Sequence, residues 1–261
     1  MKKQSERFPS FGYRRLTALV NRVRVGQGLL PVNHKRIYRL ASVSGLLFRP
    51  KPTQLPTRSH QGTVSVTRSD QRWCSDGLEF RCYDGSSVTM TFVLDCCDRE
   101  IISFVARAGK GLSATMVQTA LILAVEKRFQ GHMTQHHPVE FLTDNGSAYR
   151  AKATLNLEKK LKIIDRKTAV CSPQSNGMAE SLVHTLKRDY LPFTDLSSAI
   201  AAMRALPELI ERYNQEHPHS ALGYRSPREY RASQINSIVQ QTTFVPDPVC
   251  ATAESGAYTF W

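Results

Sequence analysis

Apolar residues recur at three- and four-residue spacing between residues 10 and 48, which is the pattern of amphipathic helices. The pattern occurs twice, on either side of a break at QGLLPV, and basic residues lie outside both apolar stripes. The inward positions are Leu16, Leu19, Val20 and Val23 in the first segment and Ile37, Leu40 and Ala41 in the second. Pro31 stands where the second helix could start, and Gly45 where it could end. Two short helices across a turn predict a unit that resembles a helix-turn-helix.

From about residue 70 the pattern changes to strands. RWCSDGLEFRC, SSVTMTFVLD and EIISFVARA predict three strands, and the short segments between them predict the turns of an antiparallel meander. Alternation places four side chains on one face of the first strand: Cys74, Asp76, Leu78 and Phe80. Helical and strand patterns then alternate through SATMVQTALILAVEKRF, PVEFLTD, ATLNLEKKL and KIIDRKTA. A meander followed by this alternation predicts an α/β fold on a mixed five-stranded sheet flanked by helices.

The C-terminal part of the pattern is helical and then weakens. Asn176 follows the polar loop SPQSNG and is placed to cap the helix MAESLVHTLKRDYL. A further helical stretch, LSSAIAAMRALPELIERYNQEH, is interrupted at Pro207. The predicted domains are a basic helical domain at 1–50, a proline-containing linker at 51–68, a catalytic core with C-terminal helices at 69–232, and a tail of unknown role at 233–261.

Charge is distributed unevenly between these regions. Residues 1–60 hold 13 Lys/Arg and one acid, a net charge of +12, whereas residues 61–261 hold 22 Lys/Arg and 21 acids, a net charge of +1. A basic domain beside a neutral one indicates a module that binds a polyanion. The alternative is a solvated basic face that serves only solubility.

Other composition features narrow the class of protein. No apolar run approaches the ~20 residues that a membrane span needs, and no apolar segment follows the two N-terminal lysines as in a signal peptide. The six cysteines show neither a disulfide-framework spacing nor a C-x-x-C metal spacing. We therefore expect a cytoplasmic protein without a membrane partner.

Three carboxylates are placed for catalysis. Asp76 lies mid-strand on an otherwise apolar face, and Asp144 stands at the end of a strand before the turn NGS. Glu180 is in the first turn of a helix, pointing away from that helix's apolar face, with His184 and Lys187 on its own side. Taken singly, each acid is more simply a turn, cap or helix-dipole residue. Together they predict a site for hard divalent cations, which prefer carboxylate oxygens and would relieve the repulsion among clustered acids.

The spacing of these acids and the short sequence motifs around them resemble those of a known family. Asp144 and Glu180 are separated by 35 residues, and Lys187 follows seven residues after Glu180. Together with Asp76, this resembles the Asp-Asp-35-Glu signature of retroviral integrases and of OrfB-type transposases of bacterial insertion sequences. The motifs that are similar to those of the family are WCSD at 73–76, LTDNGS at 142–147, SPQSNGMAES at 172–181, HPHSALGY at 217–224 and VNHKRIYRL at 32–40.

The resemblance implies a fold, a reaction and partners. It implies a ribonuclease-H-like integrase core that binds two Mg²⁺ (or Mn²⁺) ions through Asp76, Asp144 and Glu180. The expected reaction is attack by water or a DNA 3′-OH on a phosphodiester, without a covalent enzyme intermediate. The expected partners are transposon-end and target DNA, further copies of the chain assembled on that DNA, and an upstream-frame protein or fusion partner. Such a bacterial protein would associate with the nucleoid.

The DNA-contact candidates are cations and polar residues near the predicted site and in the basic domain. They are Lys187, Arg188, His184 and Asn176 near the site, and Arg14, Arg15, Lys35, Arg36 and Arg39 in the basic domain. Leu78 replaces a threonine common in the family two residues after the first aspartate. The upstream helix-turn-helix and leucine zipper of such transposases are missing from this sequence. That leaves recognition of specific DNA ends open.

Other polar groups are weaker candidates. Asp95 and Asp98 flank a turn and read as turn and strand-end residues. The adjacent Cys96 and Cys97 cannot easily ligate one zinc, since neighbouring strand residues point to opposite faces. Three histidines at 132, 136 and 137 read as loop residues.

We therefore predict a transposase that cleaves and joins DNA strands at insertion-sequence ends. One alternative is a non-catalytic DNA-binding regulator or inhibitor of transposition from the same family. Another is a structure-selective nuclease on the same core.

Overall fold

The computed structural model describes residues 1–48, 66–130, 137–167 and 176–243, with side chains described as far as residue 235. Most of the predicted linker, most of the loop SPQSNG and the end of the predicted tail lie outside the described residues. His132, His136 and two of the six cysteines, Cys171 and Cys250, lie outside them as well.

The centre of the molecule is a mixed five-stranded sheet with the strand order β3-β2-β1-β4-β5. The strands are β1 (Arg72–Arg81), β2 (Ser87–Asp95), β3 (Ile101–Ala108), β4 (Val139–Thr143) and β5 (Ile163–Lys167). Antiparallel pairing joins the first three strands, and β4 and β5 add in parallel on the other side of β1. The predicted mixed sheet is confirmed, and β1 is its middle strand.

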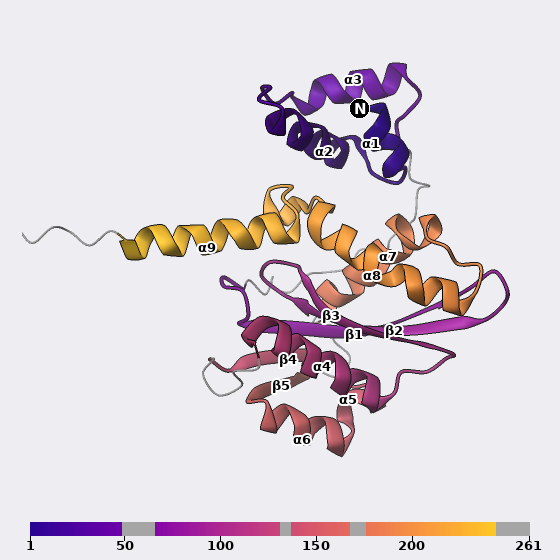
Figure 1. Cartoon of the computed structure of the whole chain (residues 1–261), viewed down its shortest axis with the longest axis vertical. Helices are drawn as coiled ribbons and strands as arrows, with labels where there is room; N and C mark the ends of the chain where they lie inside the picture. The colour runs from indigo at the N-terminus through magenta and orange to yellow at the C-terminus, as the bar shows by residue number, and fades with distance from the viewer. Residues whose placement is uncertain (49–65, 131–136, 168–175, 244–261) are drawn as a thin grey trace, which may run out of the picture.

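Helices cover both faces of this sheet (Figure 1). One face carries α4 (Ala114–Phe129), α5 (Ser147–Arg150) and α6 (Lys152–Lys160), and the other carries α7 (Gly177–Asp189) and α8 (Ala199–Glu216). Alternation along β1 divides its side chains between the two layers: Trp73 packs in the core under α4, while Cys74 and Leu78 pack in the core under α7 and α8. The apolar face predicted for β1 is therefore the α7 face.

The C-terminal elements differ from the sequence pattern in two places. Pro207 lies inside α8, which continues to Glu216, so the predicted interruption is wrong. A proline removes one backbone hydrogen bond, and the buried face of α8 compensates for that loss. Two short 3₁₀ turns, η2 (Leu191–Phe193) and η3 (Ser220–Leu222), precede α9 (Pro227–Thr243). The helix α9 crosses the predicted start of the tail at residue 233, where sequence periodicity is weak.

Three helices form the N-terminal region: α1 (Lys2–Arg7), α2 (Tyr13–Gly26) and α3 (His34–Val43). The sequence pattern missed α1, which is short and polar. Asn33 caps α3 through a hydrogen bond from the Lys35 amide, so this helix begins three residues after Pro31. Leu40 and Val23 are 48% and 45% exposed, so the two inward assignments are wrong. Each lies near the end of a short helix, where only one narrow stripe contacts the neighbouring helix.

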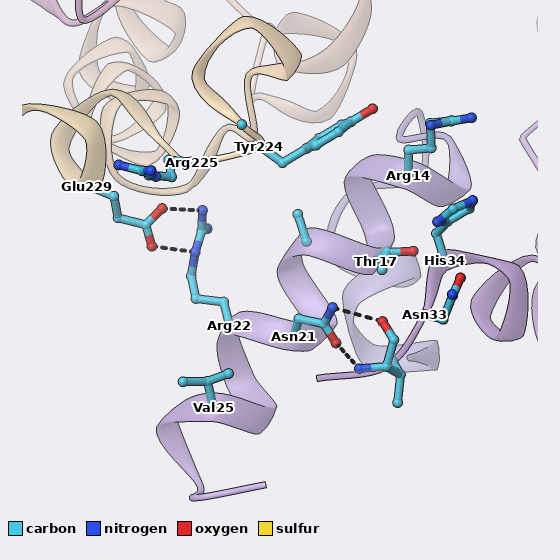
Figure 2. A pocket seen from close by; sticks show the side chains of 13 residues that line it. Arg14, Thr17, Asn21, Arg22, Val25, Asn33, His34, Tyr224, Arg225 and Glu229 are labelled. Atoms are coloured by element: carbon cyan, nitrogen blue, oxygen red, sulfur yellow. Dashed lines mark hydrogen bonds and ion pairs between the residues drawn. The ribbon is translucent and has the colours of Figure 1, made fainter. Parts of the chain in front are cut away.

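The helical region packs on the core through ion pairs and aromatic contacts. Arg15 pairs with the buried Asp189 at the end of α7, with 2.8 Å between Nη1 and Oδ2. Figure 2 shows Arg22 of α2 reaching Glu229 of α9 through two contacts, both of 2.6 Å. Phe11 contacts the ring of His217 edge to face. The predicted basic domain is thus held against α7, α8 and α9.

Candidate active site

The pairing of β1 with β4 brings two of the predicted acids together. In this parallel ladder Cys74 lies opposite Leu142. Continuing the same register by two residues on each strand sets Asp144 beside Asp76, on the face that α7 covers. Adjacent strands lie about 4.8 Å apart, so the two carboxylates are neighbours.

A tight turn fixes the carboxylate of Asp144 at the end of β4. Its Oδ1 accepts a hydrogen bond from the Gly146 amide at 2.9 Å. A Cβ built on Gly146 would lie 2.9 Å from that same oxygen, so only glycine fits without displacing the carboxylate. The turn NGS therefore does more than end the strand, because it holds one of the candidate ligands.

Helix α7 brings Glu180 over the same part of the sheet. Asn176 stands at the N-cap position of α7, but its side chain makes no capping hydrogen bond. Its amide nitrogen instead donates to the carbonyl of Ser75 at 3.0 Å, and the residue is buried. The first turn of the helix that carries Glu180 is thus tied to the residue before Asp76. In this structure Asn176 braces the site, and the DNA contact expected of it stays a prediction.

A buried hydroxyl cluster supports β1 from the opposite face. The Tyr149 hydroxyl lies 2.9 Å from Ser75 Oγ and 3.3 Å from Thr91 Oγ1. The cluster joins α5, β1 and β2 directly beneath Asp76. Burial raises the pKa of the Tyr149 phenol above its usual value, so the phenol stays protonated and can donate. Sequence analysis missed this support because single hydroxyl residues carry no spacing signal.

Electrostatics link the three acids. Burial raises the pKa of Asp76, and the negative charges of Asp144 and Glu180 raise it further. A hydrogen bond from the Gly77 amide and the positive charge of Lys187 act in the opposite direction. A carboxylate that is disfavoured as an anion by burial and by two neighbouring acids would gain from a bound cation.

The donor set fits a hard divalent cation in its chemistry, since it consists of carboxylate oxygens on three elements that meet at one face. Within the described ranges, no three His, Cys, Asp or Glu side chains are already gathered tightly enough to hold an ion. Asp76 and Asp144 each accept a hydrogen bond from a nearby backbone amide, of Gly77 and Gly146. Each amide occupies only Oδ1, so Oδ2 of both carboxylates is left for an ion.

Cations line the exposed side of α7. His184, Lys187 and Arg188 are exposed, and Lys187 contributes to the electrostatics of Asp76. Arg188 instead pairs with Asp189, at 2.7 Å between Nη2 and Oδ2. His184 and Lys187 thus remain open to a ligand at the site, whereas Arg188 already has an acidic partner.

The basic candidates of the helical region fall into two groups. Arg14, Lys35, Arg36 and Arg39 are exposed, and no carboxylate among the described residues forms an ion pair with them. Arg14 lies on the rim of a cavity of about 890 Å³ between α2 and the start of α9 (Figure 2). Arg15 differs because its guanidinium is half-buried and paired with Asp189. We therefore assign Arg15 an internal contact, and its DNA contact stays a prediction.

The acids around the β2–β3 turn form a separate cluster. Asp98 is fully buried and pairs with Arg128 of α4, at 3.3 Å between Nη2 and Oδ2. Glu100 pairs with the same guanidinium at 3.2 Å. Asp95 accepts hydrogen bonds from the amides of Asp70 and Cys97. The predicted turn role of Asp95 and Asp98 is confirmed by these backbone contacts, but their buried arginine partner was not foreseen.

Comparison with known proteins places this geometry in a family. Two models described as "Integrase core domain" match residues 66–176 and 162–227. The chain is 48% identical, over 223 residues, to the "Transposase InsD for insertion element IS2A/D/F/H/I/K" of Escherichia coli, covering 85% of this chain and 73% of that protein. The transposase InsD for insertion element IS2D of E. coli K12 matches with the same identity and coverage.

A solved structure shares the fold. A simian T-cell lymphotropic virus intasome, solved in complex with the PP2A regulatory subunit B56 gamma, contains a chain that matches with a TM-score of 0.52 at 15% identity. The match covers 87% of this chain and 73% of that chain. None of the described helices is long and apolar enough to cross a membrane. Together, the matched core models and the close curated relatives show that the chain belongs to the insertion-sequence transposases of the retroviral-integrase-like superfamily.

Proposed function

We propose that the chain cleaves and joins DNA strands at the ends of an insertion sequence, with Asp76, Asp144 and Glu180 as the ligands of two divalent ions, Mg²⁺ or Mn²⁺. The observation that carries the proposal is the parallel register of β1 and β4, which sets Asp144 beside Asp76 on the face covered by the Glu180 helix. The raised pKa of Asp76 supports it, because this carboxyl is short of positive charge in the protein alone.

The chemistry is a phosphoryl displacement. A pair of bound ions would lower the pKa of an attacking water or orient a DNA 3′-OH, and would stabilise the departing oxygen. The new O–P bond forms as the O–P bond to the leaving 3′ oxygen breaks, and the attacking group gives its proton to solvent. The chain itself holds Asp144 in its turn, braces α7 through Asn176, and supplies the exposed Lys187 for the phosphate backbone.

The DNA contacts form a second part of the proposal. Exposed cations on α3 (Lys35, Arg36 and Arg39) and Arg14 on α2 would bind backbone phosphates. Curated relatives at 48% identity are transposases of insertion elements, and a structural neighbour is part of a viral intasome. We therefore propose that several copies of the chain assemble on the DNA ends.

A strand-transfer assay tests the catalytic assignment. Pre-nicked insertion-sequence-end DNA is incubated with Mg²⁺ or Mn²⁺ and either the wild type or Glu180→Gln. We expect the wild type to join strands and Glu180→Gln to fail, while both bind DNA equally. The substitution Glu208→Gln, on an exposed position of α8, serves as the matched control and should join normally.

The other outcomes separate the alternatives. Cleavage without joining would favour a structure-selective nuclease. If neither protein joins but both bind DNA, the chain is a regulator or needs an upstream-frame partner, which adding that partner would reveal. Joining by Glu180→Gln in a metal-replete assay would overturn the ligand assignment.

A further inference from the structure

A small polar cavity lies behind α7, on the side of the helix roughly opposite Glu180. It has a volume of about 160 Å³ and is enclosed by α2, the β2–β3 turn, α7 and the segment that follows α8. The lining side chains of α7 recur at positions 178, 181, 182 and 185, which is one helix face. Its polar lining side chains include Arg15, Arg99, Ser181, Thr185, His217 and His219.

Three nitrogen atoms around this cavity are buried and have no hydrogen-bond partner in the part of the chain that the structure describes. They are Nε2 of His217, Nε2 of His219 and Nε of Arg99. His217 is itself fully buried, and the two imidazole rings lie 4.6 Å apart between centroids. Buried polar groups are almost always satisfied, so three unsatisfied nitrogens on residues that line one cavity indicate a missing partner.

The contact between Tyr190 and His217 bears on the proton of this imidazole. The Tyr190 hydroxyl lies 3.0 Å from Nδ1 of the ring. Burial raises the pKa of Tyr190 well above its usual value, so the phenol keeps its proton and can donate a hydrogen bond to Nδ1. With Nδ1 as the acceptor, the ring hydrogen of a neutral His217 sits on Nε2. Nε2 is then a buried donor without a partner, and Nε of Arg99 is another.

The electrostatic potential in the cavity is positive. Burial lowers the pKa of His217, and the charges of His219, Arg15 and Arg188 lower it further. Burial is also the main cause that lowers the pKa of His219, and the charges of Arg99 and Arg15 lower it further. The facing acid is Asp189, which already pairs with both Arg15 and Arg188. No ion pair of the described residues includes Arg99. Such a site disfavours metal cations and favours an anion.

We propose that this cavity binds a single phosphate-type oxyanion, held by Arg99, His217 and His219. Its volume of about 160 Å³ is several times the ~30 Å³ share of one water, so one tetrahedral oxyanion fits. Ser181 and Ser220 are exposed and mark the opening. The ligand is either free inorganic phosphate or a phosphate of DNA. Only the DNA case rests on the proposed function.

The first test measures thermal unfolding of the full chain in phosphate and in chloride at equal ionic strength. For the wild type we expect phosphate at ten times its dissociation constant to raise the Tm by about 3–6 °C. Arg99→Asn should lose this increment, and asparagine suits the backbone there because Arg99 has a φ of 63°. The control Arg204→Gln removes an exposed arginine of α8 and should keep the full increment.

The proposal is tested by comparing the Tm increment in phosphate between the variants. Phosphate stabilises many proteins by exclusion from their surface, and that general effect would be the same in every variant. Equal increments in the wild type, Arg99→Asn and Arg204→Gln would therefore overturn the proposal. If Arg99→Asn fails to fold, the side-chain ¹⁵N signal of His217 in the wild type replaces it. We expect Nε2 to shift on phosphate addition, and no shift would overturn the proposal.

A measurement of DNA binding distinguishes the two sources of the ligand, free phosphate and a phosphate of DNA. If the occupant is a DNA phosphate, Arg99→Asn should also weaken binding of a duplex oligonucleotide and reduce the salt dependence by about one phosphate contact. If the occupant is free phosphate, duplex binding should be unchanged while the Tm increment is lost. Failure of the strand-transfer assay would leave the phosphate result intact, so the two proposals fail independently.

Discussion

Two groups of acids lie on the same sheet and have opposite surroundings. At the α7 face, burial and the negative charges of Asp144 and Glu180 raise the pKa of Asp76, and the positive charge of Lys187 opposes them. At the other group, Asp98 and Glu100 share the fully buried guanidinium of Arg128. Burial alone would raise the pKa of Glu100, but Arg128 and Lys127 hold that pKa below its usual value.

The difference shows how one residue type serves two purposes. The Arg128 cluster is neutralised by the protein itself, so its acids hold the β2–β3 turn against α4 and α9. At the Asp76 group the protein supplies less positive charge, so the Asp76 carboxylate would be stabilised by a cation from outside. Stability and catalysis are therefore assigned to different acids, and substitutions should separate them.

The largest effect is expected at the Asp76 group. Asp144→Asn keeps an oxygen that can accept the Gly146 amide hydrogen bond but removes the negative charge. We expect strand joining to fall by at least about 10³-fold, as when a group needed in the transition state is lost. Single-turnover joining of pre-nicked DNA measures it. Asp84→Asn, in the remote β1–β2 hairpin, should join at the wild-type rate.

The next effect is on folding. Arg128→Leu leaves Asp98 and Glu100 buried without their shared cation, and we expect the free energy of unfolding to fall by about 3–5 kcal/mol. Urea unfolding measures this loss. Lys127→Gln is the matched control, since Lys127 is half-exposed and lies 3.7 Å from Glu100. Lys127→Gln should lower the free energy of unfolding by less than about 1 kcal/mol. Equal losses in both variants would contradict the distinction.

Glu158 of α6 belongs to neither group of acids and provides a further test of the comparison. Glu158 of α6 is buried, and both its carboxylate oxygens lack a hydrogen bond to any described residue. Burial raises its pKa to about 7, against a small opposing effect of Lys167. The folded chain then binds a proton that the unfolded chain releases, so stability is lost as pH rises from about 4.5 through 7.

Glu158→Gln should remove that loss. We expect its unfolding free energy at pH 8 to exceed that of the wild type by about 1–3 kcal/mol, with little difference at pH 4.5. Urea unfolding at the two pH values measures the difference. A wild-type pH dependence that persists in Glu158→Gln would show that another group is responsible.

The smallest effect is on stability at the catalytic face. Asp76→Asn removes a buried charge that burial, Asp144 and Glu180 all disfavour. Without divalent ions, we expect it to raise the unfolding free energy by about 0.5–1 kcal/mol at neutral pH. Thermal unfolding in EDTA tests this. A clear destabilisation would mean that Asp76 is a structural acid like Asp98.

The strand and helix pattern of the core was predictable because it depends on local periodicity. Alternation along β1 placed Cys74, Asp76 and Leu78 on one face, as the structure does. Asp144 and Glu180 could be found from their spacing and from the family motifs around them. Only the structure shows, through the register of β4 and the contact of Asn176 with Ser75, how they come to lie near Asp76. Their ligand roles stay predictions.

What sequence reasoning missed depends on contacts between distant residues. Arg128 looks like an ordinary basic end of a helix, and only the fold shows its three acidic neighbours. Leu40 was placed inward because periodicity cannot tell how wide a stripe the neighbouring helix covers. Pro207 was read as a break because the local rule ignores the packing energy of the buried face of α8.

The contact between Arg15 and Asp189 has a mechanical consequence. Asp189 ends α7, and Glu180 lies in its first turn, so the helix is a rod of 13 residues, about 20 Å long, fastened at both ends. Asn176 anchors one end to the strand of Asp76, and Arg15 anchors the other to the basic helical domain. The position of Glu180 therefore depends on the basic helical domain as well as on the sheet.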